Sequence, residues 1–379
     1  MYEPREDSYL LQKFVKKYAR GFVLDVGTGS GIQAVTAAEK TGVEKVLAVD
    51  VDRKAILQNQ KAIDNKKIVF RASDLFSNVK QGFDTIIFNP PYLPSVKVKD
   101  ITVDGGRKGY EVIEMFLQDA SEHLEPEGSI LLLFSSLTKK SKVDEAIADT
   151  LFVSELLEEK YIGGFEALYV YQLKKSSLLK WLEKNGISGI KKFMKGHRGI
   201  IYTGIHNRRK VAVKVQRKDI GVEGTVDREA NVLKKLNRKG IGPKVILTAP
   251  DIIIYEFVKG DFIEKFIEKS PKYKIKEVLL DVFRQCFVLD KLKLNKEEMH
   301  NPYKHIIVDI HPVMVDFERC KPTIDPKNVT QFCQYIMLLK PMLEKKGFKI
   351  DRERLMNLAR EYKKRMTERN FQEILGILA

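Results

Sequence analysis

Residues 83–95, FDTIIFNPPYLPS, begin as an apolar run and stop at an amide, two prolines and an aromatic ring. The Asn89 side-chain oxygen and the Pro90 carbonyl can accept both hydrogens of a planar NH2 group, while the Tyr92 ring stacks on its face. Two prolines stiffen the turn that holds these acceptors. Such a site binds an amide or an exocyclic amine and aligns its nitrogen with an electrophile. The candidate catalytic residues here are Asn89, Pro90, Pro91 and Tyr92.

A second group of residues indicates the electrophile. LDVGTGSGIQAV places Gly27, Gly29 and Gly31 between an apolar strand and a helix, where missing side chains let the backbone approach a ligand. About 20 residues on, VLAVDVD ends a second strand at Asp50, whose carboxylate can accept both hydroxyls of a ribose. Asp74 follows a third strand, in RASDLF. Together they predict an adenosine-bearing ligand, and the sulfonium methyl of S-adenosylmethionine is an electrophile that suits an amide nitrogen.

These residues stand at the ends of strands in a repeating pattern. From 22 to 173, short β-branched runs alternate with helical stretches, which predicts an α/β fold with a parallel, Rossmann-like sheet wrapped by helices. In such a sheet a ligand lies beyond the carboxyl ends of the strands, so we expect the residues above to meet there. The segment FEALYVYQLKK, residues 165–175, is predicted to be the last strand, at an edge of the sheet.

The motif order resembles the class I methyltransferases that carry an NPPY tetrad. At the amino end, YEPREDSYLL resembles the Y-E-P-x-E-D-[ST]-x-L-L opening of the archaeal and eukaryotic HemK-like enzymes, which methylate the glutamine of the GGQ motif in translation release factors. VDGGRKGYEVIEMFL resembles the glycine-rich segment that follows their tetrad. The resemblance covers about residues 1–173 and implies a release factor as substrate.

The resemblance also implies roles for individual residues. The S-adenosylmethionine contacts that it implies are Ser8, Asp25, Gly27, Asp50, Asp74 and Leu75. Asn89, Pro90 and Tyr92 would hold the glutamine amide. A small zinc-binding activator subunit is a further partner implied by the resemblance alone.

Nucleic-acid methyltransferases remain an alternative. DNA and RNA adenine methyltransferases use the same tetrad on a flipped base, since an exocyclic amine offers the same two hydrogens. They normally need a target-recognition region, and residues 1–175 contain no obvious insertion of that kind.

Charge is distributed unevenly along the chain. Residues 1–175 carry 24 Lys and Arg against 26 Asp and Glu, and residues 176–379 carry 43 against 25. The net charges are therefore near −2 and +18. A solvated Lys-rich surface would explain the excess, and so would a nucleic-acid partner, because dense positive charge attracts phosphate backbones without reading sequence. In the second case we expect a contact with rRNA, tRNA or the ribosome.

A different set of motifs follows in the second half. KGHRGIIYTGIHNRRKVAVKV places Gly196 and Gly199 before a strand that contains Lys214, and Glu229 follows fifteen residues later on a predicted helix. A glycine hairpin over phosphates and a strand lysine form the front of a protein-kinase nucleotide site, where a helix glutamate pairs with the lysine. Asp316 opens DFE, where kinases have the D-F-G that holds magnesium.

Residues 190–379 resemble the small atypical kinases of the RIO type and the related predicted archaeal Ser/Thr kinases. The resemblance implies an α+β protein-kinase-like domain that binds ATP and magnesium, with Asp316 as a metal ligand. Three departures are visible in the sequence: Met194 replaces the first glycine of the loop, Glu318 replaces the glycine of D-F-G, and HRD or HGD is missing.

The missing motif leaves the chemistry of this half open. Glu298 lies near the catalytic aspartate position and His305 near that of the metal-binding asparagine. If the alignment is shifted by two residues, His300 takes the place of Glu298. Phosphoryl transfer to a protein, ATP hydrolysis, and nucleotide binding or scaffolding without catalysis are the three alternatives.

The predicted domains are residues 1–175, the methyltransferase domain, 176–194, a basic helical linker, and 195–379, the kinase-like domain. Within the last, residues 199–216 and 243–258 alternate like antiparallel strands, and 327–379 is largely helical.

The cysteines and the amino-terminal residues indicate the cellular compartment. The three cysteines contain no CxxC spacing, so neither a disulfide framework nor a structural zinc site is expected. MYEPREDSYLL carries three acidic residues where a secretory signal would be apolar, and no uninterrupted apolar run approaches ~18 residues. We therefore expect a cytoplasmic protein without membrane contact.

Overall fold

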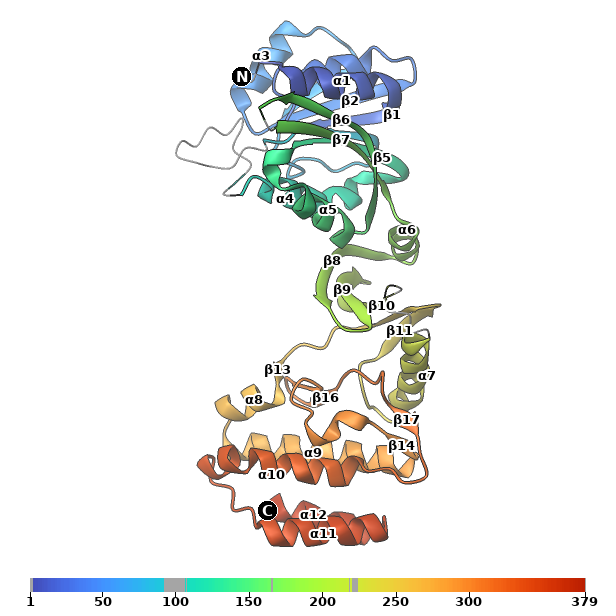
Figure 1. Cartoon of the computed structure of the whole chain (residues 1–379), viewed down its shortest axis with the longest axis vertical. Helices are drawn as coiled ribbons and strands as arrows, with labels where there is room; N and C mark the ends of the chain where they lie inside the picture. Colours follow the sequence, from blue (N-terminus) through green and yellow to red (C-terminus); the bar gives the residue numbers. More distant parts are fainter. Residues whose placement is uncertain are drawn as a thin grey trace. The chain divides into compact units, whose positions relative to one another are not determined.

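The structure, a computed structural model, describes two compact units (Figure 1). The described residues are 3–91, 106, 108–164, 166–217, 219 and 224–378. Unit 1 comprises Met1–Lys192 and Gly204–Asn207, and unit 2 comprises Phe193–Thr203 and Arg208–Ala379. Within the described ranges, no helix is both long and apolar enough to cross a membrane.

Unit 1 is built on a seven-stranded sheet of order β3-β2-β1-β4-β5-β7-β6. The strands are β1 (Gly21–Val26), β2 (Val43–Asp50), β3 (Ile68–Ala72), β4 (Phe83–Phe88), β5 (Leu124–Ser135), β6 (Phe152–Gly163) and β7 (Glu166–Lys175). The first five run parallel, whereas β7 is antiparallel to both of its neighbours. The predicted α/β fold is thereby confirmed, but the sheet is mixed and not wholly parallel as predicted.

Helices cover both faces of this sheet (Figure 1). They are α1 (Glu6–Tyr18), α2 (Ile32–Ala38), α3 (Arg53–Ala62), α4 (Glu111–His123), α5 (Lys140–Asp149) and α6 (Ser177–Lys184). Apolar residues of α1, α2 and α3 form one core with alternate strand residues such as Val23 and Ile87. On the opposite face Phe88 stacks on Phe116 of α4, with ring centroids 4.2 Å apart. Adjacent strand residues thus serve two cores, which explains why these strands read as continuous apolar runs.

The predicted edge strand is wrong in its position. Residues 166–175 form β7, which lies between β5 and β6, and β6 occupies the edge. The reason is the composition of β6, which exposes most of its side chains, in contrast to the almost completely buried β7. A strand with so many exposed polar residues lacks the apolar run from which strands were predicted.

The α+β part of the chain after α6 contains a five-stranded sheet of order β11-β12-β10-β9-β8. Its strands are β8 (Ile187–Lys195), β9 (Gly199–His206), β10 (Arg209–Gln216), β11 (Val245–Ala249) and β12 (Ile252–Glu256). The short strands β13 (Asp261–Phe262), β14 (Leu294–Asn295), β15 (Ile306–Val308), β16 (Pro312–Met314) and β17 (Lys321–Pro322) pair in two small sheets. Antiparallel pairing of β12 with both β10 and β11 agrees with the alternation seen in the sequence.

The helices of unit 2 share one apolar core with its strands. They are α7 (Thr225–Asn237), α8 (Ile263–Lys269), α9 (Lys272–Lys291), α10 (Asn328–Lys345), α11 (Arg352–Lys364) and α12 (Glu368–Leu375). The buried Asp290 carboxylate ties three of them together, since it accepts hydrogen bonds from the Asn328 backbone and side-chain nitrogens and from the Tyr362 hydroxyl. The predicted helical carboxyl-terminal part is confirmed.

The predicted helix over 176–194 is wrong in its second half. Helix α6 ends at Lys184, and residues 187–195 form β8. Gly186, with φ of +74°, follows the helix in the left-handed conformation that ends many helices. After it, β8 buries Ile187 and Ile190 and exposes Lys191 and Lys195. Over so short a run the apolar spacing of a helix and that of a strand coincide, so the sequence pattern does not distinguish them.

Candidate active site

The carboxyl ends of four neighbouring parallel strands, β3, β2, β1 and β4, open onto one cavity of about 910 Å³ in unit 1. The lining includes the predicted residues Ser8, Asp25, Gly27, Gly29, Asp50, Asp74, Leu75, Asn89, Pro90 and Pro91. Gly31 is not part of this lining, and a Cβ at this position would stand 2.8 Å from the Ile63 side chain. Tyr92 lies outside the described residues. The structure therefore brings nearly all of the first set of predicted residues to one place.

The turn after β1 is shaped by its glycines and by Asp50. Gly27 and Gly29 have φ of +65° and +51°, a conformation that favours glycine. The Asp50 carboxylate accepts the Gly29 N–H at 2.9 Å and the Asp52 N–H at 2.8 Å, one on each oxygen. Each carboxylate oxygen retains a second lone pair. Asp50 is thus held rigidly and can still accept two hydroxyls.

Asp25 lies beneath this turn and is almost completely buried. Its carboxylate accepts the Thr28 hydroxyl at 2.6 Å. Burial raises the pKa of Asp25 from 3.8 to about 7; the Thr28 hydrogen bond opposes the shift and the Asp50 charge adds to it. Asp25 therefore changes its charge near neutral pH, directly beside the cavity.

Leu75 adopts a conformation that is uncommon for a leucine, with φ of +43°. Hydrogen bonds of the surrounding turn hold it: Ser73 Oγ donates to the Leu75 carbonyl at 2.9 Å, and the Ser77 N–H donates to the Asp74 carbonyl at 2.9 Å. Backbone strain of this kind is kept where the neighbouring structure fixes it, often at ligand sites. The turn carries Asp74 and Leu75 to the cavity wall.

Asn89 is oriented by Asp7, which the sequence analysis did not single out. The Asn89 Nδ2 group donates to Asp7 Oδ2 at 3.0 Å. Because a carboxylate oxygen only accepts, the NH2 end of the amide must face Asp7 and the oxygen must face away. Asn89 Oδ1 is buried and has no hydrogen-bond partner among the described residues. The YEPREDSYLL opening contains Asp7, but nothing in its spacing indicated a contact 82 residues away.

A second buried acceptor lines the same cavity. Gln33 is 4% exposed, and its Nε2 donates to the Ser8 carbonyl at 2.8 Å. Gln33 Oε1 has no hydrogen-bond partner within the described part of the chain. Leaving a buried acceptor unsatisfied costs about 1–3 kcal/mol. Two such oxygens in one cavity indicate that it receives a ligand with N–H donors.

The residues of this cavity fit S-adenosylmethionine. Asp50 can accept the ribose hydroxyls, and Gly27 leaves open space on its cavity side, where a Cβ would approach only the Phe88 ring, at 4.0 Å. The Gln33 oxygen, which has no partner among the residues that the structure describes, suits an amino group of the same ligand. The glycine turn, Asp50 and the mixed seven-stranded sheet define a class I, S-adenosylmethionine-dependent methyltransferase.

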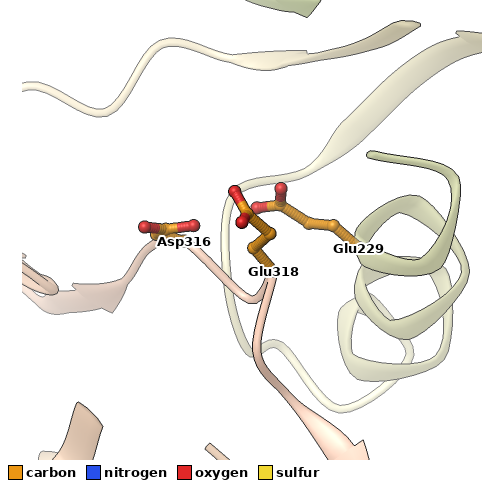
Figure 2. A group of neighbouring side chains, drawn as sticks. All are labelled: Glu229, Asp316 and Glu318. Carbon is orange, nitrogen blue, oxygen red and sulfur yellow. The ribbon is translucent and has the colours of Figure 1, made fainter. Parts of the chain in front are cut away.

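Unit 2 contains a second group of charged side chains, around Lys214 of β10. The Lys214 ammonium contacts Glu229 Oε2 at 2.6 Å and lies 3.2 Å from oxygens of both Asp316 and Glu318. Glu229 extends from α7, and the other two carboxylates from the segment after β16 (Figure 2). One oxygen of each carboxylate lies within 4.8 Å of the others.

Burial makes this group strongly coupled. Lys214 is 6% exposed and Glu229 is 1% exposed. Burial lowers the pKa of Lys214, but the carboxylates of Glu229 and Asp316 outweigh it, so the pKa is raised. The other oxygen of Glu229 accepts the Phe317 N–H at 3.1 Å. Lys214 thus remains charged, and Glu229 is fixed on two sides.

The hairpin between β8 and β9 packs against the same lysine. The Gly196 N–H donates to the Gly199 carbonyl at 2.8 Å, which closes the turn. A Cβ on Gly199 would lie 3.2 Å from Lys214 Cε. Of the two predicted loop glycines, Gly199 therefore lies next to Lys214, and Gly196 is hydrogen-bonded to Gly199.

Other predicted residues of unit 2 lie around Asp316. Lys296, which the sequence analysis missed, is fully buried; its ammonium donates to the Asp316 carbonyl and lies 3.5 Å from Glu298 Oε2. His305 Nδ1 is buried 3.9 Å from Asp316 Oδ2, with no hydrogen-bond partner among the described residues. His300 is exposed, and its Nδ1 contacts a backbone carbonyl of its own turn. The sequence does not indicate that Lys296 is buried, because it is one of several lysines in a Lys-rich segment.

Comparison with known proteins places unit 1 in a family. Residues 6–161 match the model of the methyltransferase small domain. A putative protein N5-glutamine methyltransferase of Methanocaldococcus jannaschii is 38% identical over 146 residues, which are 36% of this chain and 74% of that protein. The chain therefore belongs to the methyltransferase small-domain family.

Two further similarities concern release factor methylation. A release factor glutamine methyltransferase of Koribacter versatilis is 39% identical over 125 residues, 29% of this chain and 45% of that protein. One solved structure is that of the E. cuniculi Mtq2–Trm112 complex, described as responsible for methylation of the eRF1 translation termination factor. The matched chain of that complex is 28% identical to this chain, with a TM-score of 0.38. The match covers 46% of this chain and 98% of that chain. This chain thus spans less than half of the bacterial protein.

Asp25→Asn should remove a pH dependence of stability. Because the pKa of Asp25 is raised from 3.8 to about 7 on folding, the folded protein keeps a proton that the unfolded chain has released between these values. The contribution of Asp25 to the free energy of unfolding is therefore largest at low pH and falls as pH rises from about 4 to about 7. The variant should gain stability relative to the wild type over this range.

Urea unfolding followed by fluorescence of Trp181, the single tryptophan of the chain, reports on unit 1 alone. Asp64→Asn, at an exposed carboxylate of the same unit, is the matched control. Its difference from the wild type in free energy of unfolding should stay nearly constant over the same pH range. A stability difference between Asp25→Asn and wild type that stays constant from pH 4.5 to about 7.5 would contradict the assignment.

Proposed function

We propose that unit 1 methylates the side-chain amide nitrogen of a glutamine, and that this glutamine belongs to the GGQ motif of a translation release factor. The observation that carries the proposal is the Asn89 oxygen, which is buried at the cavity and has no hydrogen-bond partner among the described residues, while Asp7 accepts from the nitrogen of the same amide. The printed names of two relatives support the substrate class: one is a putative protein N5-glutamine methyltransferase, the other a release factor glutamine methyltransferase.

The mechanism depends on alignment. S-adenosylmethionine, when bound, supplies an electrophilic methyl group and leaves as S-adenosylhomocysteine. Asn89 Oδ1 and the Pro90 carbonyl would accept the two hydrogens of the substrate amide, which orients its nitrogen and stabilises the positive charge that develops there. The amide finally releases one proton to solvent. Asp7 is a positioning residue, because it keeps the oxygen of Asn89 toward the substrate.

The test is transfer of labelled methyl to a release factor, with peptide mapping of the product. The small zinc-binding activator subunit implied by the family resemblance is included as a proposed partner. Label should appear on the GGQ glutamine and be lost in the GGR variant of the release factor. Label on DNA or RNA controls instead would favour the adenine methyltransferase alternative, and no label in any arm would reject the proposed substrate.

Asn89→Ala separates chemistry from cofactor binding in this assay. It removes an acceptor for the reacting amide but not the Asp50 side of the cavity, so methyl transfer should fall by at least about 100-fold. Affinity for S-adenosylmethionine, measured by calorimetry, should change little. Gln58→Ala, at an exposed amide of α3, serves as the matched control and should keep full activity.

For unit 2 we propose nucleotide binding as a second function. The buried Lys214–Glu229 pair at 2.6 Å, with Asp316 3.2 Å from the same lysine, supports it. Lys214 would contact a phosphate of ATP, with Asp316 as the magnesium ligand and the Gly196–Gly199 hairpin close by. Glu298 is the proposed catalytic carboxylate if phosphoryl transfer occurs.

Calorimetric titration with magnesium and ATP tests this function. Saturating S-adenosylhomocysteine is added first, because the adenosine-binding cavity of unit 1 could also take ATP. Wild type should bind and Lys214→Met should lose binding by at least about tenfold. Lys210→Met, at an exposed lysine of the same strand, should bind like the wild type. Equal binding by all three proteins would exclude Lys214 from the site.

We also propose that unit 2 contacts structured RNA such as rRNA or tRNA, by itself or on the ribosome. A cavity of about 1010 Å³ in this unit is lined by Lys235, Arg238, Lys239, Leu292, Lys293, Leu294, Pro322, Thr323 and Ile324. No acidic residue is in this lining, and none of its four cations forms an ion pair within the described residues. Unpaired cations of this kind attract phosphates.

Filter binding to an rRNA fragment at increasing KCl tests the RNA contact. Replacing Lys235, Arg238 and Lys239 together by Glu should weaken binding and lower the slope of log affinity against log salt by about 2. The matched control replaces the exposed cations Lys349, Arg352 and Lys363 by Glu. If both triple variants lose affinity equally, the cavity is not the contact.

A further inference from the structure

One carboxylate of unit 2, that of Glu318, is held between two cations that come from different elements. Arg198, in the hairpin between β8 and β9, approaches Glu318 Oε1 with its Nη1 at 3.0 Å. Lys214 approaches Glu318 Oε2 at 3.2 Å. The Glu318 side chain is only 13% exposed. A lysine and an arginine that converge on one small anion form the arrangement with which proteins bind a phosphate group.

The lysine has no free donor left for a ligand. An ammonium has three N–H groups, and Lys214 faces three carboxylates, those of Glu229, Asp316 and Glu318. A phosphate that binds Lys214 must therefore displace one of them. The question is which carboxylate can leave.

Glu318 is the carboxylate that can move. Glu229 is 1% exposed and also accepts the Phe317 N–H, so its removal would leave a buried backbone donor unsatisfied. Asp316 is more exposed, at 47%, but its side chain is short and its backbone is fixed, because its carbonyl accepts from the buried Lys296 ammonium. Glu318 has a longer side chain, and its two cations include Arg198, which is 29% exposed at the outer edge of the cluster.

We propose that Lys214 and Arg198 form a binding site for a nucleotide phosphate, and that Glu318 occupies this site as an internal carboxylate until a nucleotide displaces it. The inference rests on the proposed nucleotide binding by unit 2 and assigns Arg198 and Glu318 roles in it. A carboxylate and a phosphate oxygen accept the same charged hydrogen bonds, so the exchange keeps both cations paired. The measured ATP affinity then depends on how much more tightly the two cations bind the phosphate than the Glu318 carboxylate.

Glu318→Gln tests the competition, because it keeps the shape of the side chain and removes its charge. Titration of full-length protein with ATP in EDTA and saturating S-adenosylhomocysteine isolates the phosphate contact from any metal. The variant should bind ATP about tenfold more tightly than wild type. Adding Arg198→Met to this variant should weaken its binding again by about the same factor.

Glu256→Gln is the matched control, since Glu256 of β12 is also ion-paired, to Arg209, but belongs to a different contact. It should bind ATP like the wild type. Near-ultraviolet circular dichroism verifies that each variant is folded. Equal or weaker binding by Glu318→Gln, with wild type still binding, would overturn the internal occupant and leave nucleotide binding standing. Absence of ATP binding by wild type and variant, in EDTA and with magnesium, would reject both.

Discussion

The parallel pairing of β3, β2, β1 and β4 is the constraint on which the methyltransferase unit depends. Val26 is the register partner of Val49 on one side and of Phe88 on the other, so β1, β2 and β4 end at the same level. Asp50 pairs with Ala72 in the same way at the end of β3. The residues directly after these strands, Gly27, Val51, Ser73 and Asn89, therefore line the same cavity, whatever their distance along the chain.

Asp7 adds what the sheet alone cannot provide. The strand end fixes where Asn89 lies, but an amide can face a ligand with either its oxygen or its nitrogen. The Asp7 carboxylate accepts from the nitrogen and so leaves the oxygen for the cavity. A helix that begins at Glu6 thus determines the polarity of a site built from a strand 82 residues later.

The two units present opposite electrostatic situations. In unit 1 two buried oxygens, of Asn89 and Gln33, have no hydrogen-bond partner among the described residues, which favours entry of a ligand with N–H donors. In unit 2 the charges of Lys214, Glu229 and Glu318 already satisfy one another. Burying such a cluster carries a desolvation penalty that close pairing offsets. A ligand of unit 2 must therefore displace an internal carboxylate, whereas a ligand of unit 1 supplies hydrogen-bond donors to the buried oxygens.

Much of this could be predicted because strand ends are visible in the sequence. Asp50 and Asn89 each end an apolar run, and a parallel sheet brings such ends together. Strand β6 could not be predicted from apolar runs, since its exposed edge position allows polar residues such as Glu155. The Asp7–Asn89 and Arg198–Glu318 contacts could not be predicted either, because they join side chains that are distant in sequence and that meet only through tertiary packing.

A crystal structure with S-adenosylhomocysteine and a GGQ peptide tests the central claim most directly, since it shows which atom of Asn89 meets the substrate. The account predicts that the glutamine amide nitrogen lies within hydrogen-bond distance of Asn89 Oδ1, while Nδ2 stays on Asp7. A glutamine side chain bound elsewhere, or an Asn89 amide that leaves Asp7 and turns its nitrogen to the substrate, would contradict it.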